Sequence, residues 1–400
     1  MQKKIRIAIL GSTGSIGEST LKIISKKKDR FIIDTLVAHT NYSKIKKQIR
    51  IFKPKNFIVT NFKIYKKLKS KNYKHTNMHN SAINYNLKKK LDITVSAVPG
   101  INGLPITLNF IKFTKKLLLA NKEAIICGWE ILNKFLKRYK TNLIPIDSEH
   151  FSIQELLKEN EKDNIDKIYI TASGGPFFQK KIKNNIKPKQ ALNHPKWNMG
   201  KKISIDSATM MNKVFELIEA RKLFPKYKKK IQILIHPQSL VHAIINYKNG
   251  LSKFIYHEPN MIIPISNAIL NNDVEIRNFI KLNENFSNDV NLKFYKISRK
   301  NFPPNDILGK INKFNSLPII INGANEVFVE LFLKKKIKFS SIIPNIIKVL
   351  KNKNFKKYAI QNASNINKIY DIDQWSRKTA IKIADAKWLN LFLQYWCFSQ

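Results

Sequence analysis

The chain has 400 residues, of which 43% are apolar and 10% aromatic, so it can bury the cores of two or three domains. This composition excludes a disordered chain, and no apolar run approaches the roughly 18 residues of a membrane helix. The first residues lack the features of a signal or transit peptide, and two cysteines, Cys127 and Cys397, are too few for a disulfide framework. We therefore expect a cytoplasmic protein with reduced thiols.

The net charge is +46 at pH 7, a value that raises nucleic acid as a partner. However, only 8 of the 73 basic residues are arginine, and the abundant Lys, Asn, Ile, Phe and Tyr share codons rich in A and T. The lysines are scattered and do not form one stripe interleaved with aromatic residues. We interpret the charge as compositional drift and expect no specific nucleic acid and no membrane as partners. A nucleic-acid-binding protein is the alternative from another class.

Residues 1–150 predict a doubly wound, Rossmann-like α/β domain. Apolar runs typical of buried parallel strands alternate there with helix-length segments. The predicted strands span residues 4–10, 31–37, 56–60, 92–98, 116–119 and 142–146. Polar clusters follow several of these strands, and ligands bind at the carboxyl ends of strands in such sheets, so we expect a site there.

Residues 151–285 predict a second, α+β domain. Its strands are expected at 167–171, 231–235 and 240–247, with a helix at 207–223. Asn249-Gly250 predicts a hairpin into a further strand at 251–257. Residues 286–311 are interpreted as a linker, and the helical apolar spacing of residues 312–400 predicts a small C-terminal helical domain.

Three glycines, Gly11, Gly14 and Gly17, follow the first predicted strand and open a helix. Glycines let the backbone approach a pyrophosphate, whose charge a helix N-terminus favours, so this loop predicts dinucleotide binding. Its G-x-x-G-x-x-G spacing differs from the standard G-x-G-x-x-G. The second strand ends without an acid that would bind the ribose 2′-hydroxyl, which favours NADP over NAD.

Asp147 and Glu149 are two residues apart at a strand end, where an extended chain points both to one side. Neighbouring carboxylates repel unless a cation neutralises them, and hard oxygen ligands suit Mg²⁺ or Mn²⁺ better than Zn²⁺. A third carboxylate is available from Glu216 or Glu219, and the spacing does not choose between them. A solvated acidic turn is the alternative interpretation.

Ser207 is predicted to begin a helix that carries Asn212 and Lys213 a turn later, and Ser173 lies in a Gly-rich turn. Hydroxyls, an amide, an ammonium and a helix N-terminus can together hold a phosphate. The alternative is ordinary N-capping by Ser207. The loop 194–200 suits a lid, or else a surface loop with one packed Trp197.

Taken together, these segments resemble the 1-deoxy-D-xylulose 5-phosphate reductoisomerase family. The resemblance is carried in order by LGSTGSIG (10–17), LANKE (119–123), PIDSEH (145–150), SGGPF (173–177), HPKWNMG (194–200), KISIDSATMMNK (202–213) and LIHPQS (234–239). A weaker similarity follows in NGANEVFVELFL (322–333), so nearly the whole chain is covered.

The resemblance implies a homodimeric enzyme that uses NADPH and Mn²⁺ or Mg²⁺. It would rearrange and reduce 1-deoxy-D-xylulose 5-phosphate to 2-C-methyl-D-erythritol 4-phosphate, a step of isoprenoid precursor synthesis. The implied metal ligands are Asp147, Glu149 and Glu216, which together with Lys122 form the catalytic group. The implied substrate contacts are Lys122, Ser148, Glu149, Ser173, His194, Ser207, Asn212, Lys213 and Glu216, with Ser239 nearby. The implied cofactor contacts are Thr13, Gly14, Ser15, Ile16, Asn41, Asn121, Glu123 and Gly200, and the lid carries Trp197 and Met199.

Two departures from the family pattern stand out. His39-Thr40-Asn41 replaces the common Gly-Lys-Asn, so the basic residue for the 2′-phosphate is missing at position 40. Asn198 and Lys201 replace a Ser and an Arg near the lid. A different dehydrogenase on the same fold is the remaining alternative, although such an enzyme would not need the three carboxylates and the 207–213 segment together.

Overall fold

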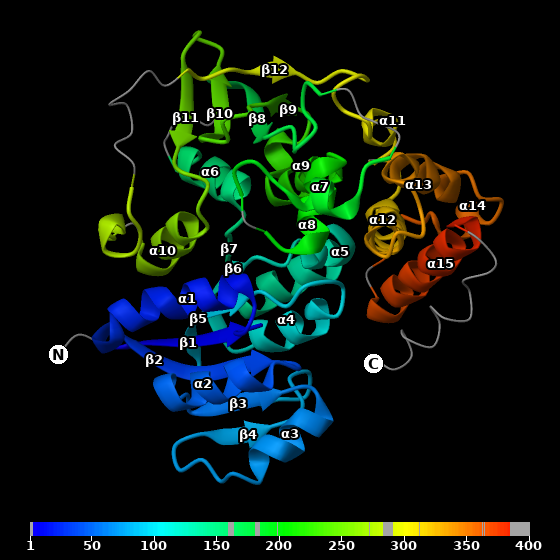
Figure 1. Cartoon of the computed structure of the whole chain (residues 1–400). Helices are drawn as coiled ribbons and strands as arrows, with labels where there is room; N and C mark the ends of the chain where they lie inside the picture. The colour runs from blue at the N-terminus through cyan, green and yellow to red at the C-terminus, as the bar shows by residue number, and fades with distance from the viewer. Residues whose placement is uncertain are drawn as a thin grey trace. The chain divides into compact units, whose positions relative to one another are not determined.

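The protein is described here by a computed structural model, which covers residues 3–158, 164–180, 185–197, 199–271, 273–282, 291–311, 313–361, 363 and 365–384. The chain divides into two compact units (Figure 1). The first unit contains residues 1–125, 130–163 and 255–291, and the second contains residues 126–129, 164–254 and 292–400. These units do not coincide with the expected boundaries at 150, 285 and 311, so the three-domain division stays a prediction. Cys397 and Asn198 lie outside the described residues.

The first unit is built on a parallel sheet of seven strands in the order β4-β3-β2-β1-β5-β6-β7. The strands are β1 (Ile5–Leu10), β2 (Phe31–Ala38), β3 (Asn56–Val59), β4 (Asn77–His79), β5 (Leu91–Ser96), β6 (Thr114–Leu119) and β7 (Asn142–Pro145). The chain runs outward from β1 in both directions, which confirms the predicted doubly wound fold. The short strand β4 was not predicted, because its three residues carry no apolar run.

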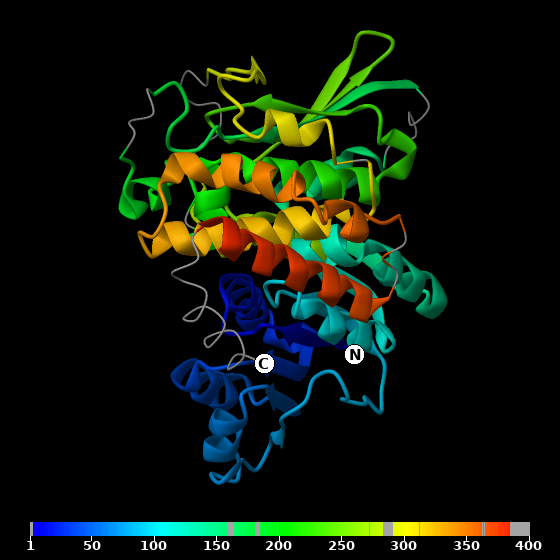
Figure 2. The same cartoon turned by 90° about the vertical axis from the view of Figure 1, so that its right-hand side faces the viewer.

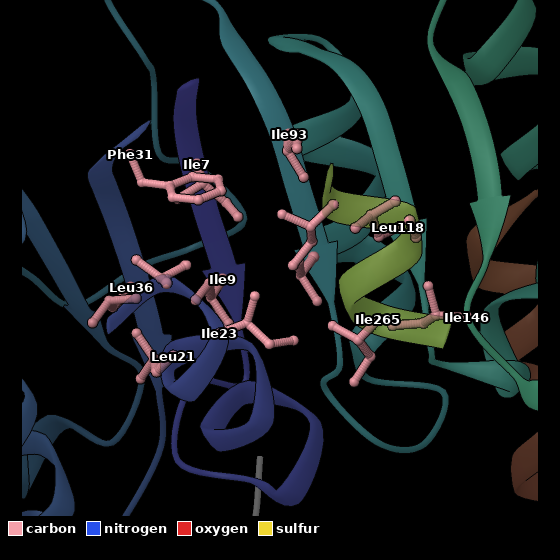
Figure 3. Close-up of a cluster of buried hydrophobic side chains, with 14 of the residues drawn as sticks. Ile7, Ile9, Leu21, Ile23, Phe31, Leu36, Ile93, Leu118, Ile146 and Ile265 are labelled. Atoms are coloured by element: carbon pink, nitrogen blue, oxygen red, sulfur yellow. The ribbon is translucent and has the colours of Figure 1, made fainter. Parts of the chain in front are cut away.

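Helices cover both faces of this sheet because successive strand side chains point to opposite sides. The helices are α1 (Ser15–Lys26), α2 (Tyr42–Phe52), α3 (Phe62–Lys69), α4 (Gly103–Ile111), α5 (Lys122–Tyr139), α6 (Ser148–Leu156) and α10 (Ile262–Leu270). Ile7 and Ile9 of β1 belong to the same buried cluster as Ile23 of α1 and Ile265 of α10 (Figure 3). Leu10 belongs to a second cluster, which includes residues of α4.

Helix α10 belongs to the first unit, although its segment was expected in the second domain. Ile265 and Ile269 are fully or almost fully buried in the core of the first sheet. Lys116 of β6 donates hydrogen bonds to the Ala268 carbonyl and the Asn271 side chain, which fixes the end of the helix. Apolar spacing marks the buried face of a helix but does not say which sheet it covers.

The second unit contains a five-stranded sheet in the order β11-β10-β8-β9-β12. Its strands are β8 (Ile165–Ala172), β9 (Ile231–Ile235), β10 (Val241–Tyr247), β11 (Ser252–Tyr256) and β12 (Tyr295–Lys296). Gly250 has a φ of +86° between β10 and β11, which confirms the predicted hairpin turn. The sheet mixes parallel and antiparallel pairs, as expected of the α+β region.

Helices of the second unit lie between β8 and β9 in sequence or follow β12. They are α7 (Pro188–Leu192), α8 (Lys201–Ala208), α9 (Met211–Leu223), α11 (Asn305–Leu308), α12 (Leu317–Leu333), α13 (Ile342–Leu350), α14 (Phe355–Tyr358) and α15 (Ile366–Ala384). Helices α12, α13 and α15 pack side by side, which confirms the predicted C-terminal helical region (Figure 2). The described helices contain no segment long and apolar enough to cross a membrane.

Two expectations for the second unit are wrong. The helix predicted at 207–223 is two helices, α8 and α9, separated at Met210, whose φ of +64° breaks the helical backbone. The segment 286–311 was expected to be a linker, but its described part forms β12 and α11. Strand β12 has two residues and pairs with β9, so its strand character depends on the neighbour and not on a local apolar run.

Candidate functional site

The glycine loop connects β1 to α1 and requires glycine at two of its positions. Gly11 has a φ of +86°, and a Cβ there would lie 2.6 Å from the Ala97 carbonyl oxygen. A Cβ on Gly17 would collide with the Gly11 carbonyl oxygen. Gly14 is the N-cap of α1 and has no side chain, so the first amides of the helix remain available to an anion. The predicted contacts Thr13, Ser15 and Ile16 lie in this loop and the first turn of α1.

The segment after β2 contains Thr40, the departure from the family pattern at which a basic residue is missing. The Asn41 side chain accepts a hydrogen bond from the Lys44 amide at 3.1 Å and so caps α2. The Lys44 ammonium donates to the Thr13 carbonyl at 3.3 Å and lies 2.8 Å from the Glu18 carboxylate. A lysine one turn into α2 therefore brings a cation to the glycine loop, but it shares its charge with Glu18.

Asn121 follows β6 and holds three pieces of backbone together. Its side chain accepts from the Ala124 amide at 3.1 Å, which caps α5, and donates to the carbonyls of Val98 at 2.6 Å and Gly100 at 3.1 Å. The neighbouring Glu123 is buried in the first turn of α5. The residue predicted as a cofactor contact is thus also a fixed part of this strand end.

Asp147 and Glu149 lie where β7 ends and α6 begins. Asp147 is the N-cap of α6 and accepts from the Glu149 amide at 3.3 Å, and carboxylate oxygens of the two residues lie within 4.8 Å of each other. The Lys122 ammonium lies 3.5 Å from Asp147, and the Ser148 hydroxyl donates to Glu149. The structure therefore gathers Lys122, Asp147, Ser148 and Glu149 in the first unit, as predicted.

His150 is a residue that the sequence reasoning missed. It is fully buried on α6, and its Nδ1 lies 3.3 Å from Asp147 Oδ1. The signal was present in the sequence, because residues three apart near the start of a helix lie on one side of it. His150 therefore lies against the first carboxylate.

Glu216 lies on α9 of the second unit, with 2% of its side chain exposed. It forms an ion pair with Lys213 and accepts a hydrogen bond from the Asn212 side chain, both in the first turn of the helix. These three residues were predicted on one helix, and the structure confirms that placement. Glu219 is buried one turn further along α9.

The turn after β8 fixes the orientation of the Ser173 hydroxyl. His194 Nδ1 accepts from the amides of Lys196 at 3.2 Å and Trp197 at 2.9 Å, so the neutral ring carries its proton on Nε2. Nε2 lies 2.9 Å from Ser173 Oγ and donates to it, and the Gly175 amide donates to the same oxygen at 3.1 Å. With both lone pairs used, the Ser173 hydroxyl can act as a donor. Burial lowers the pKa of His194 to about 4, which keeps the ring neutral near pH 7.

Ser207 is placed next to this turn, but not where the sequence predicted it. A Cβ on Gly175 would lie 2.7 Å from the Ser207 carbonyl oxygen, so the Gly-rich turn packs against the end of α8. Ser207 lies in the last turn of α8 and does not cap a helix, which excludes the N-capping alternative. Gly200 is the N-cap of α8, while Ser239 is buried with a φ of +55°.

The lid segment contains one ring contact among its described residues. The Trp197 ring lies edge-on to His242, with 6.0 Å between centroids. His242 is buried.

Comparisons with known proteins agree along nearly the whole chain. Three family models match: "1-deoxy-D-xylulose 5-phosphate reductoisomerase" at residues 7–128, its C-terminal domain at 143–224, and "DXP reductoisomerase C-terminal domain" at 257–379. The chain is 46% identical over 381 residues to the 1-deoxy-D-xylulose 5-phosphate reductoisomerase of Pelagibacter ubique, covering 92% of this chain and 97% of that protein. It is 37% identical to the Wolbachia enzyme over 390 residues, covering 96% and 98% of the two chains.

Solved structures give the same result. A DOX-P reductoisomerase in complex with NADPH, fosmidomycin and magnesium matches with a TM-score of 0.86 and 32% identity, covering 96% of this chain and 99% of that one. The reductoisomerase from Zymomonas mobilis in complex with NADPH matches with a TM-score of 0.81 and 29% identity, covering 96% and 100%.

Proposed function

The chain belongs to the 1-deoxy-D-xylulose 5-phosphate reductoisomerase family, and from that premise we propose how its own residues carry out the reaction of the family. The reaction rearranges 1-deoxy-D-xylulose 5-phosphate and reduces the product to 2-C-methyl-D-erythritol 4-phosphate with NADPH. The observation that carries the activity is the 46% identity to a curated reductoisomerase over 92% of the chain.

The substrate phosphate is assigned to the second unit. Ser173 Oγ already accepts hydrogen bonds from His194 and from the Gly175 amide. Its hydroxyl proton is therefore available to donate to the phosphate. Asn212 and Lys213 contribute an amide and an ammonium from the first turn of α9, where the helix dipole favours an anion. Ser207 completes this cradle from the end of α8, and Ser239 is assigned beside it.

The divalent cation is assigned to Asp147, Glu149 and Glu216. The donor set fits Mg²⁺ or Mn²⁺, because these side chains offer hard carboxylate oxygens and two of them already lie within 4.8 Å of each other. Glu216 is chosen over Glu219 on the family resemblance. When bound, the cation supplies a Lewis acid that polarises the ketone of the substrate. His150 and Ser148 support the ligands by fixing the positions of Asp147 and Glu149.

Lys122 is assigned to the substrate oxygens. Its side chain is 11% exposed and its ammonium is held 3.5 Å from Asp147, so it is a preorganised donor. Such a donor stabilises negative charge that develops on a substrate oxygen during the rearrangement.

NADPH is assigned to the glycine loop and the neighbouring strand ends. The fit rests on the uncapped first turn of α1 and on the close backbone approach that Gly11 and Gly17 permit. When bound, NADPH supplies the hydride that reduces the rearranged aldehyde. Further contacts come from Thr13, Gly14, Ser15, Ile16, Asn41, Asn121, Glu123 and Gly200. Trp197 and Met199 are assigned to a lid that excludes water.

The proposal is tested by following NADPH oxidation with purified protein and 1-deoxy-D-xylulose 5-phosphate. Turnover is expected with Mn²⁺ or Mg²⁺, is expected to stop on chelation, and is expected to return when the cation is restored. The matched control is the same assay without substrate. Oxidation that persists in chelator, or that requires a different ketone or an aldehyde instead, would contradict the assignment.

We further propose that the enzyme is a homodimer working in the cytoplasm. The dimer is supported by the family resemblance, and the cytoplasm by relatives that are bacterial biosynthetic enzymes. Light scattering on the purified protein measures the oligomeric state, and fractionation of the source cells measures the location. A monomer that turns over at the full rate would contradict the dimer.

A further inference from the structure

A cavity of about 560 Å³ lies beside α2 in the first unit. Two segments line it: one side of α2 with the residue that ends it, and the chain between α3 and β4. Six of its lining residues are basic: Lys46, Lys47, Arg50, Lys53, Lys74 and His75. None of the described residues that line it carries a carboxylate. We call it the α2 pocket.

The basic residues of α2 lie together because of their spacing. Lys46 and Arg50 are four residues apart in α2, so they project from one side of the helix, and Lys53 follows as the C-cap residue with a left-handed backbone. Like charges at this spacing repel each other and destabilise a helix. An anion bound in the α2 pocket would relieve that repulsion, so the pocket is arranged to favour a ligand of opposite charge.

Two tyrosines add ring surface to the α2 pocket. The ammonium groups of Lys67 and Lys71 lie 4.8 and 5.8 Å from the centroid of the Tyr42 ring, which brings more positive charge to that wall. Tyr73 is the second tyrosine of the lining.

The Lys53 end of the α2 pocket is remote from the glycine loop, whereas Tyr42 and Ser43 at its other end follow the assigned cofactor contact Asn41. The pocket runs along α2 to Lys53 and Thr76, which stand shortly before β3 and β4 at the amino ends of these parallel strands. The glycine loop follows β1 at the carboxyl edge of the same sheet. The 11 residues of α2 extend about 16 Å between the two edges. The Lys53 end is thus remote from the dinucleotide phosphates.

We propose that the α2 pocket binds a small anion with two or more adjacent phosphate groups. The volume lies in the range of small-molecule pockets, whereas a duplex needs an extended surface. Five Lys and Arg side chains exceed what a single phosphate requires, and a chain of phosphates can contact several of them in turn. The tyrosine rings and lysine stems would pack against any apolar or planar group that the phosphates carry.

The test is calorimetric titration of the full chain with inorganic phosphate, pyrophosphate, tripolyphosphate and ATP at one fixed ionic strength. We expect pyrophosphate and tripolyphosphate to bind at least about tenfold more tightly than phosphate. Tighter binding of ATP than of tripolyphosphate would identify a nucleoside polyphosphate as the ligand, and equal binding would identify the polyphosphate chain alone.

The variant Lys46→Gln/Arg50→Gln should weaken tripolyphosphate binding by at least about tenfold. The matched control is Lys22→Gln/Lys26→Gln, which removes the same charge from an exposed side of α1 outside the α2 pocket. NADPH binding by both variants shows that they are folded. Equal losses in the two variants, or displacement of tripolyphosphate by NADPH, would overturn the proposal. Equal losses would mean that tripolyphosphate is attracted by the general positive charge of the surface. Displacement by NADPH would mean that tripolyphosphate binds in the cofactor site.

Discussion

At the scale of single residues, the carboxylates carry the most direct prediction. Asp147→Asn, Glu149→Gln and Glu216→Gln should each reduce turnover by a factor on the order of a thousand or more, because each removes a charged oxygen proposed to hold the cation. NADPH should still bind, since the glycine loop belongs to other elements. Turnover per folded enzyme and NADPH fluorescence are the measurements.

The matched control for these variants is Glu219→Gln on the same helix. It should change turnover per folded enzyme only mildly, because Glu219 is not among the assigned ligands. An essential Glu219 together with a dispensable Glu216 would reverse the choice of the third ligand.

We expect position 40 to affect the choice between the two nicotinamide cofactors. A charge-assisted bond to a phosphate contributes about 1.5–3 kcal/mol, which is roughly tenfold to a hundredfold in affinity. Lys44 reaches the glycine loop but pairs with Glu18 at 2.8 Å, so it replaces the missing cation only in part. Thr40→Lys should therefore tighten NADPH binding by about tenfold or more and leave NADH almost unchanged.

Dissociation constants for the two cofactors, measured by fluorescence, check this prediction. Thr40→Gln is the control, because it adds length without charge. Equal gains for NADPH and NADH in Thr40→Lys would show that position 40 does not face the 2′-phosphate.

His194 should make the stability of the protein depend on pH. Burial holds its pKa at about 4, whereas an unfolded histidine titrates near 6.5. Between these values the unfolded chain binds a proton that the folded chain does not, so the stability of the fold falls as the pH decreases from 6.5 to 4. After allowance for partial exposure, the loss between pH 7 and pH 5 is on the order of 1 kcal/mol.

Urea unfolding of the protein and of His194→Gln at both pH values isolates this contribution. Glutamine keeps a donor for Ser173 but does not titrate, so the variant should lose less stability on acidification than the unmodified protein. An identical loss in both would mean that His194 is already protonated in the folded state at pH 5.

At the scale of secondary-structure elements, a buried ion-pair network joins α12 to α15. Arg377 of α15 donates to Asp373 at 2.6 Å and to Glu326 of α12. Although burial opposes it, the Arg377 charge holds the pKa of Glu326 below its ordinary value. Arg377→Met leaves the buried Asp373 and the half-buried Glu326 without this cation, which should cost about 3 kcal/mol of unfolding free energy.

Thermal unfolding measures this loss. Lys378→Met is the control, because Lys378 is the exposed neighbour of Arg377 on the same helix. Adding Asp373→Asn to Arg377→Met should recover part of the stability. No loss in Arg377→Met would mean that the helices are held together by apolar packing alone.

The secondary-structure elements also show how much of the fold the sequence could predict. Strands β1, β2, β3, β5, β6 and β7 were all predicted, because a strand buried on both faces is a local run of apolar residues. The break at Met210 was missed, since Met and its neighbours keep helical spacing through the break. As a result Ser207 was predicted at a helix start, whereas it lies near a helix end next to Gly175.

The candidate site likewise has features that the sequence could predict and features that it could not. The glycine loop and the Asp147–Glu149 pair are contiguous in sequence, so their local geometry was predictable. The orientation of the Ser173 hydroxyl was not, because it depends on His194 and on two amides that face that ring. Contacts between distant segments are set by tertiary packing, which no local spacing encodes.

At the scale of the whole molecule, the net charge of +46 makes the surface attractive to any polyanion. If the lysines are compositional drift, duplex DNA should bind weakly, without regard to sequence, and the affinity should fall steeply as salt rises. Fluorescence anisotropy with two unrelated duplexes of equal length, at low and at physiological salt, measures both properties. Tight binding of one sequence at physiological salt would restore nucleic-acid recognition as a function.

The paired variants of α2 and α1 sharpen this last prediction. Lys46→Gln/Arg50→Gln and Lys22→Gln/Lys26→Gln each remove two positive charges, so a diffuse electrostatic attraction to DNA should weaken to the same small extent in both. Small polyphosphates should distinguish them, because those ligands enter the α2 pocket and a duplex does not. If DNA binding instead falls far more in the α2 variant, the basic side of that helix contacts nucleic acid directly, and the charge of this chain has a function beyond composition.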